Sequence, residues 1–352
     1  MWSPSGVTQK SDYAVIDYHS LIPPSIIAAC QTRLAGAARS TPMTPAPLSA
    51  WGEDQVPPHY VKAECLQSAG SHTYRGAFLA LDDLDPPQLR RGVVAASTGP
   101  YALALMYARR YWPELRRITV VLPNSNSSLS ELLPELGADV RLHSGTSRDR
   151  ERAAQRIARE SGQTFLLTSG RAAVCGAATV AREMLNEQPD LAAIIAPVGS
   201  GALLAGIVSA AAAHPTPVRV IGAEPLGAGT CYSSHQTGTR VLVRTSSPTG
   251  LAADLDHGAP ARYPWHIWRD RVDMVQVTDA DIRAAMDYLL WHHHLGASAA
   301  GATAMAAALA FPDRLPDGPV GVLCSGGPLA STSHLSAPSS RACAWADLPL
   351  AA

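Results

Sequence analysis

The sequence predicts an α/β fold in which helices cover both faces of mostly parallel sheets. Short apolar runs alternate with helical segments along most of the 352 residues, and several runs end directly in a glycine-containing turn. This alternation is typical of doubly wound sheets, whose strands are buried on both faces and therefore read as continuous apolar runs. The length suits about two domains of this kind.

The expected elements follow one another in a regular order. A short strand at Tyr60–Val61 precedes a helix that begins near Arg75. Further strands are expected at 92–96, 117–122, 139–142, 192–197, 219–223, 274–277 and 319–324. Further helices are expected at 101–111, 129–136, 148–160, 173–186, 203–213, 279–292 and 297–309. Residues 1–30, where Pro23 and Pro24 interrupt any helix, and residues 226–262 are expected to be irregular.

The composition argues against several function classes. With a net charge of −1, the chain offers no electrostatic case for binding nucleic acid or an anionic membrane. The six cysteines are scattered, without a C-x-x-C pair or a zinc spacing, and we expect them to be reduced. The run His292–His294 cannot bind one ion with all three rings, because adjacent helix positions point in different directions. Neither the cysteines nor this histidine run therefore predicts a metal site. The sequence shows no signal-peptide pattern and no apolar run long enough to cross a bilayer, so we expect a cytoplasmic protein.

Two strand–turn–helix stretches can present polar groups to a ligand. Residues 61–78 contain a polar turn around Gly70 and Ser71, and the first amides of the following helix have no partner within it. The loop Gly199–Leu203 follows an apolar strand and opens a helix. Its glycines allow a phosphate to approach the backbone, although such turns also occur simply for tight packing.

The first stretch resembles the pyridoxal-phosphate (PLP) enzymes of fold type II. That family includes threonine dehydratase, serine racemase, threonine synthase, cysteine synthase and the tryptophan synthase β chain. Its signature is roughly K-x-E-x-x-Q-x-x-G-S-F-K-x-R-G-A, and the second lysine forms the Schiff base with the cofactor. The residues in register are Lys62, Glu64, Gln67, Gly70, Ser71, Arg75, Gly76 and Ala77. Thr73 stands at the Schiff-base position, and His72 replaces the preceding phenylalanine.

Three later segments extend the resemblance. The loop after Pro197 resembles the family's glycine-rich phosphate loop, which implies the cofactor-binding residues Gly199, Ser200, Gly201, Ala202, Leu203 and, later in the chain, Ser325. In the family, a hydroxyl at the position of Ser325 bonds the pyridine nitrogen. Ala202 departs from a family glycine and is tolerable only if its backbone keeps a negative φ. Gly250-Leu251-Ala252 resembles the family's D-G-L-A.

The segment Ser97–Tyr101 resembles S-x-G-N-H, whose asparagine bonds the ring hydroxyl of the cofactor. Pro100 takes the place of that asparagine and cannot make the bond. Thr98 lies where serine-racemase-like members carry a second acid/base hydroxyl, although its position favours the role of an N-cap for the following helix.

The resemblance implies a tryptophan synthase β-like architecture. We expect a larger domain made of residues 1–88 and 166–330, a smaller mobile domain at 89–165, and a flexible tail at 331–352. The family also implies a homodimer and a small amino-acid-like ligand.

Because Thr73 stands where the family has its Schiff-base lysine, three hypotheses about function remain open. The first is a lyase-type enzyme that acts on an amino acid or a derived small molecule without an internal aldimine, with PLP held non-covalently at most. Its catalytic candidates are Ser71, His72, Thr73, Thr98 and Tyr101. The second is a catalytically inactive pseudoenzyme that serves as a ligand sensor or partner subunit. The third is a conventional PLP lyase that uses Lys10 or Lys62, the only lysines of the chain.

Overall fold

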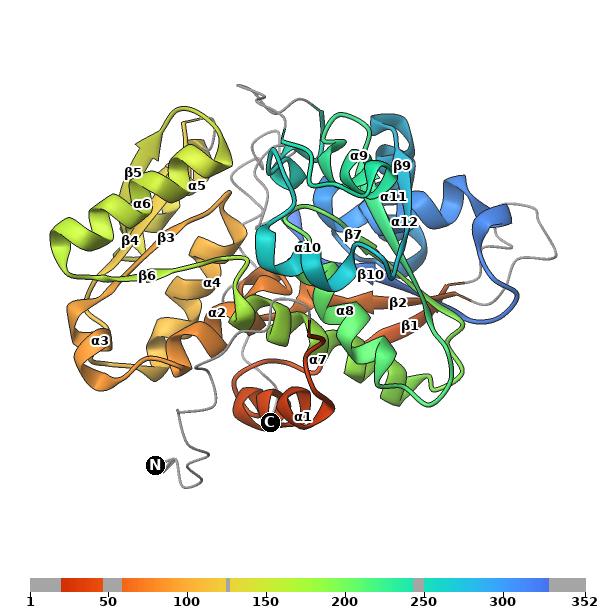
Figure 1. Cartoon of the computed structure of the whole chain (residues 1–352), viewed down its shortest axis with the longest axis horizontal. Coiled ribbons are helices and arrows are strands. Elements are labelled where there is room, and N and C mark those ends of the chain that lie inside the picture. The colour runs from red at the N-terminus through yellow and green to blue at the C-terminus, as the bar shows by residue number, and fades with distance from the viewer. Residues whose placement is uncertain (1–19, 47–58, 125–126, 243–249, 329–352) are drawn as a thin grey trace.

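The computed structural model describes residues 20–46, 59–124, 127–242 and 250–328 (Figure 1). Two separate sheets organise this part of the chain, and the expected tail at 331–352 and Lys10 lie outside it. None of the helices described is both long and apolar enough to span a membrane.

The larger sheet has the strand order β1-β2-β10-β7-β8-β9. Its strands are β1 (Met43–Ala46), β2 (His59–Ala63), β7 (Ala193–Pro197), β8 (Arg219–Pro225), β9 (Asp273–Val277) and β10 (Val320–Cys324). Only the edge strand β1 runs antiparallel to its neighbour. The α/β fold with parallel strands is thus confirmed for this sheet.

The smaller sheet has the order β5-β4-β3-β6, and all its strands are parallel. Its strands are β3 (Val93–Ala96), β4 (Ile118–Pro123), β5 (Asp139–His143) and β6 (Thr164–Leu166). Figure 1 shows the two sheets side by side, the smaller at the left, with helices between them and around them.

Helices cover both faces of the larger sheet. The helices are α1 (Pro24–Leu34), α2 (Thr73–Asp82), α3 (Pro86–Arg91), α4 (Pro100–Ala108), α5 (Ser127–Glu135), α6 (Ser147–Ser161), α7 (Arg171–Glu187), α8 (Ala202–Ala212), α9 (Thr230–Thr237), α10 (Arg262–Trp268), α11 (Asp279–His293) and α12 (Ala299–Ala310). The core that includes α7 and α8 extends without interruption to residues of the smaller sheet. Helices α11 and α12 form a second core against β2 and β10 on the other face.

Two expectations about irregular segments were wrong. Residues 24–34 form α1, because Pro24 occupies the first helical position, where the missing N–H costs nothing. Residues 230–237 form α9, because the buried carboxylate of Glu224 accepts hydrogen bonds from the amides of Cys231 and Tyr232, both at 2.8 Å. A cap supplied from another element leaves no signal in the local sequence.

Candidate active site

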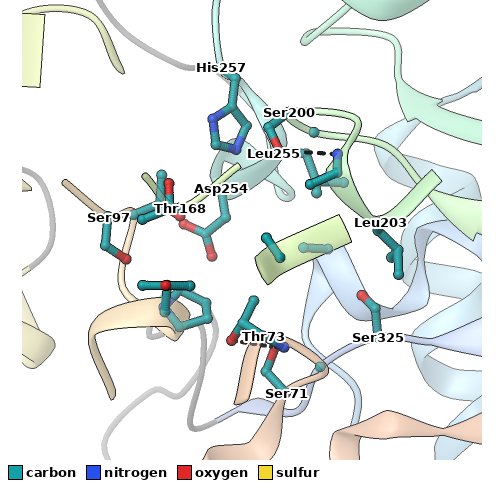
Figure 2. Close-up of a pocket in the computed structure, with 18 of the residues that line it drawn as sticks. Ser71, Thr73, Ser97, Thr168, Ser200, Leu203, Asp254, Leu255, His257 and Ser325 are labelled. Atoms are coloured by element: carbon teal, nitrogen blue, oxygen red, sulfur yellow. Dashed lines mark hydrogen bonds between the residues drawn. The ribbon is translucent and has the colours of Figure 1, made fainter. Parts of the chain in front are cut away.

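A cavity of about 160 Å³ lies where the carboxyl ends of strands from both sheets meet. The residues that follow β3, β6, β7 and β10 all contribute to its wall, as expected for a ligand site in an open α/β fold. The catalytic candidates of the first hypothesis and the cofactor-binding candidates all line this one cavity: Ser71, His72, Thr73, Thr98, Tyr101, Gly199, Ser200, Gly201, Ala202, Leu203 and Ser325. Figure 2 shows Ser71, Thr73, Leu203 and Ser325 on one side of it, and Ser97 and Thr168 facing them.

The turn that carries Ser71 and His72 is fastened to the end of β10. Ser71 forms an isolated antiparallel bridge with Gly326. The amide of His72 donates to the carbonyl of Ser325 at 3.1 Å, and the amide of Gly327 donates to the carbonyl of Gly70 at 2.9 Å. The first residues of α2 are therefore held at a fixed position beside Ser325.

The imidazole of His72 has a defined tautomer. Its Nδ1 lies 3.1 Å from the carbonyl oxygen of Ser325. A carbonyl oxygen can only accept, so Nδ1 carries the proton and Nε2 keeps its lone pair. Burial lowers the pKa of His72, although the carbonyl of Ser325 opposes this. The ring is therefore neutral near pH 7 and presents a basic nitrogen.

Thr73 contributes only a hydroxyl to the cavity. Its Oγ1 donates to Oγ of Ser71 at 3.2 Å, and its amide lies 3.3 Å from the same oxygen. The cavity wall contains no lysine among the residues that the structure places.

Lys62 forms ion pairs and a hydrogen bond away from the cavity. Its side chain is fully buried, and its Nζ lies 3.0 Å from Glu183, 2.9 Å from Glu187 and 2.7 Å from the carbonyl of Thr41. Arg75, from the same stretch, pairs with the buried Glu64 at 2.7 Å. Both cations belong to one buried network beneath the site and do not line the cavity.

The beginning of α4 has few amides left for a ligand. Ser97 Oγ accepts from the amides of Gly99 at 2.9 Å and Ala102 at 3.3 Å, and Pro100 has no N–H. Ser97 thus supplies a hydrogen-bond acceptor to the first turn of α4, whose N-cap position is Gly99. Burial raises the pKa of Tyr101 well above its usual range, with a smaller contribution from the charge of Asp83. Tyr101 thus stays protonated and can donate a hydrogen bond but not act as a base.

The loop Gly199–Leu203 has the geometry of an anion cradle. Gly201 has φ +86°, and a Cβ there would lie 2.4 Å from Nε1 of Trp268. A Cβ on Gly199 would lie 2.9 Å from the ring of His257. Ala202 is the first residue of α8, so the positive φ falls on Gly201 and the alanine is tolerated. The amide of Ala202 donates to Oγ of Ser200 at 3.4 Å, and the dipole of α8 favours a phosphate at this place.

Gly201→Ala is expected to lower both stability and affinity for a phosphate compound. The added methyl group meets a strained φ and the Trp268 ring, at a cost of about 2–3 kcal/mol. Gly238→Ala is the matched control, because Gly238 has φ +65° but nothing within 4 Å of the added Cβ. Denaturation midpoints and titration with pyridoxine phosphate would check this. Equal losses in the two variants would contradict a steric requirement at the loop.

Several polar residues of the wall escaped the sequence analysis. Asp254 and His257 follow the Gly250-Leu251-Ala252 segment, and Ser147 and Arg150 lie in the first turns of α6. Nδ1 of His257 lies 3.5 Å from Oγ of Ser147, so this pair joins the two parts of the wall. Burial, and next the charge of Arg150, lower the pKa of His257 to about 4, which keeps the ring neutral. Ser147 and Arg150 closely follow the end of β5, and that position could have revealed them, whereas Asp254 and His257 lie far along the chain from the end of the preceding strand, β8.

Comparison with known proteins places this geometry in a family. Residues 34–326 match the family model described as pyridoxal-phosphate-dependent enzyme. The chain belongs to this family. The expected fold class is therefore confirmed, and the cavity lies in a fold whose members use pyridoxal phosphate.

Relatives of this PLP-family protein are named as dehydratases, ammonia-lyases and racemases. Phenylserine dehydratase from Ralstonia pickettii is 32% identical over 289 residues, which cover 80% of this chain and 86% of the relative. Serine racemase from Bos taurus is 34% identical over 66% of this chain and 70% of the relative. The structure of maize serine racemase superposes with a TM-score of 0.77 at 27% identity, covering 88% of this chain and 95% of the other. The protein is thus a member of the dehydratase/racemase group of PLP fold type II.

Proposed function

We propose that this PLP-family protein is a lyase-type enzyme that acts on an amino acid, or on a small molecule derived from one, without a lysine–cofactor Schiff base. One observation carries the proposal: the neutral ring of His72, beside Thr73, is fixed by Ser325 with Nε2 left as a base. A histidine oriented through one nitrogen and basic at the other is the usual arrangement of a general base.

Pyridoxal phosphate fits the site as a non-covalent ligand. The amides of Gly199–Leu203 and the start of α8 would hold its phosphate, and the buried hydroxyl of Ser325 would face its ring. When bound, the cofactor supplies electron withdrawal that acidifies the α-proton of an amino acid. No amine lines the described wall, so the residues present do not support covalent attachment.

The chain's own residues divide the proton transfers between them. His72 Nε2 would accept the proton from the α-carbon. Thr73 and Thr98 place hydroxyls in the same cavity, and Tyr101 stays protonated, so these groups would donate hydrogen bonds to a departing hydroxyl. Removal of an α-proton together with a β-hydroxyl is a dehydration, which is the activity named for the phenylserine relative.

The test is a screen of the purified protein with added pyridoxal phosphate. Phenylserine, 3-hydroxyaspartate, serine and threonine are offered, while ammonia release and exchange of the α-proton in deuterated water are followed. We expect exchange or product with at least one of them, and no cofactor adduct after borohydride treatment. If none of the four amino acids gives ammonia release or α-proton exchange, the proposal is refuted.

A second candidate is a non-catalytic ligand sensor or partner subunit. It is favoured by the start of α4, where Ser97 and Pro100 leave few amides for a substrate carboxylate. Ligand binding without α-proton exchange, together with co-purification of a lysine-bearing homologue, would support this candidate instead. We also propose, by analogy with the family, that the protein is a homodimer.

A third reading, in which Lys62 serves as the Schiff-base residue, leads to a prediction. Lys62→Met is expected to lower stability by about 1–3 kcal/mol, because Glu183 and the carbonyl of Thr41 lose a charged donor. Ligand binding in the cavity should not change, because Lys62 does not line it. Urea denaturation and a ligand titration measure the two effects separately. Loss of a visible cofactor band in this variant alone would favour the third reading.

A further inference from the structure

His257 lies in the cavity wall between parts of the chain that belong to the two sheets. The ring edge formed by Cδ2 and Nε2 lies against Gly199, in the loop after β7. A Cβ added to Gly199 would lie 2.9 Å from Cδ2 and 3.2 Å from Nε2. The other ring nitrogen, Nδ1, lies 3.5 Å from Oγ of Ser147, the first residue of α6. Figure 2 shows His257 projecting into the cavity from the top of the view, beside Ser200 and Leu255. The proposed chemistry assigns no role to this ring.

The ring of His257 is neutral and has one proton to place. Burial, and next the charge of Arg150, lower the pKa of His257 to about 4, although the charge of Asp256 opposes this shift. A neutral imidazole donates from one nitrogen and accepts with the other. The hydroxyl of Ser147 can donate or accept, so its contact with Nδ1 is compatible with a proton on Nε2. In that tautomer, the donor of the ring lies on the side of Gly199.

A side-chain donor at this place would add to what the loop offers an anion. The dipole of α8 attracts negative charge, but the amide of Ala202, the first residue of that helix, donates to Oγ of Ser200 at 3.4 Å. A phosphate group has three terminal oxygens that are strong acceptors, and it loses hydration when it enters a cavity. A neutral N–H beside the loop replaces part of that hydration without the desolvation cost of another buried cation.

We infer that His257 is a phosphate-binding residue, whose Nε2–H donates to the phosphate of a ligand at Gly199–Leu203 while Ser147 holds the ring through Nδ1. The inference rests on the proposed function, since it takes this loop to be the phosphate site of that function. Helix α6, which begins at Ser147, packs on the smaller sheet, whereas Gly199 follows a strand of the larger one. A bound phosphate would therefore be linked through the ring to both halves of the cavity.

Two substitutions and two ligands separate the role of Nε2 from that of the rest of the ring. His257→Asn keeps an amide near the position of Nδ1 and removes Nε2, whereas His257→Gln can place its amide nitrogen near the position of Nε2. Calorimetry compares pyridoxine phosphate with pyridoxine, which lacks the phosphate. We expect His257→Asn to weaken the binding of pyridoxine phosphate by about 10- to 100-fold and that of pyridoxine by less than about threefold. His257→Gln should recover most of the lost affinity, and melting curves establish that both variants are folded.

Spectra of the protein labelled with ¹⁵N-histidine report the position of the proton. The signal of His257, identified by its absence from His257→Gln, should show a protonated Nε2 in the complex with pyridoxine phosphate. An equal loss of affinity in the two variants, a weakening shared by pyridoxine, or a proton on Nδ1 alone in the complex would each overturn the inference and leave the proposed function standing. Wild-type protein that binds pyridoxine phosphate no more tightly than pyridoxine would overturn the inference together with the phosphate site of the proposed function.

Discussion

His72→Asn is expected to lower turnover by about 100- to 10,000-fold, the range typical of losing a general base. The asparagine amide can still donate to the carbonyl of Ser325, as Nδ1 does at 3.1 Å, but it has no counterpart to Nε2. The substitution therefore removes the base while preserving the contact that orders the turn. The measurement is the initial rate with whichever amino acid the screen identifies, together with α-proton exchange.

The control for this variant is His292→Asn, the same chemical change on the exposed side of α11. It should retain the wild-type rate. A melting curve and a ligand titration on His72→Asn should match the wild type, which separates loss of the base from loss of the fold. A rate within threefold of the wild type, with binding intact, would exclude His72 as the base.

The same residue predicts the acid side of the pH profile. A protonated Nε2 cannot accept a proton, so the rate falls as pH drops through the pKa of His72. Burial lowers that pKa below its usual value near 6.5. The fall in kcat/KM should therefore lie at lower pH than for an exposed histidine, and it should vanish in the residual activity of His72→Asn.

Thr73→Lys is expected to convert the protein into one that binds pyridoxal phosphate covalently. Residue 73 lies at the start of α2 and lines the same cavity as Gly199–Leu203 and Ser325. A lysine at this position would therefore extend into the cavity that is proposed to bind the cofactor. A neutral amine beside the aldehyde forms the imine that a threonine hydroxyl cannot form. The expected results are a visible absorption band and, after borohydride, an increase in intact mass equal to one cofactor.

Thr98→Lys is the matched control, because it places the same side chain on the opposite wall. It should give a weaker adduct or none. Absence of an adduct in Thr73→Lys would show that the cavity does not hold the cofactor's aldehyde near α2. An adduct in the wild-type protein would instead contradict the proposal that no lysine is used.

Much of the fold could be predicted from the sequence because its signals are local. Buried parallel strands such as Ala193–Pro197 are continuous apolar runs, and the turn after this strand contains glycine. The residues at these turns converge on one cavity because parallel strands end at the same edge of a sheet. That rule, combined with the quoted motifs, placed Ser71, Gly201 and Ser325 together.

The parts that could not be predicted depend on partners distant in sequence. Helix α9 needs the buried carboxylate of Glu224, which belongs to β8. His257 lies in the cavity wall because it packs against Gly199 and faces Ser147. Neither contact can be recognised from the sequence around residue 257. Asp254 follows a segment that resembled the family's, but only the three-dimensional arrangement identifies it as the one carboxylate of the wall.

The bond between His72 and Ser325 has a consequence for biosynthesis. The ring and the carbonyl that orients it are separated by 253 positions. During translation His72 emerges early, whereas the carbonyl that orients it belongs to Ser325, directly after the last strand described. The nascent chain therefore cannot assemble a competent centre until Ser325 has left the ribosome, so products that end before this residue would retain much of the scaffold without its chemistry.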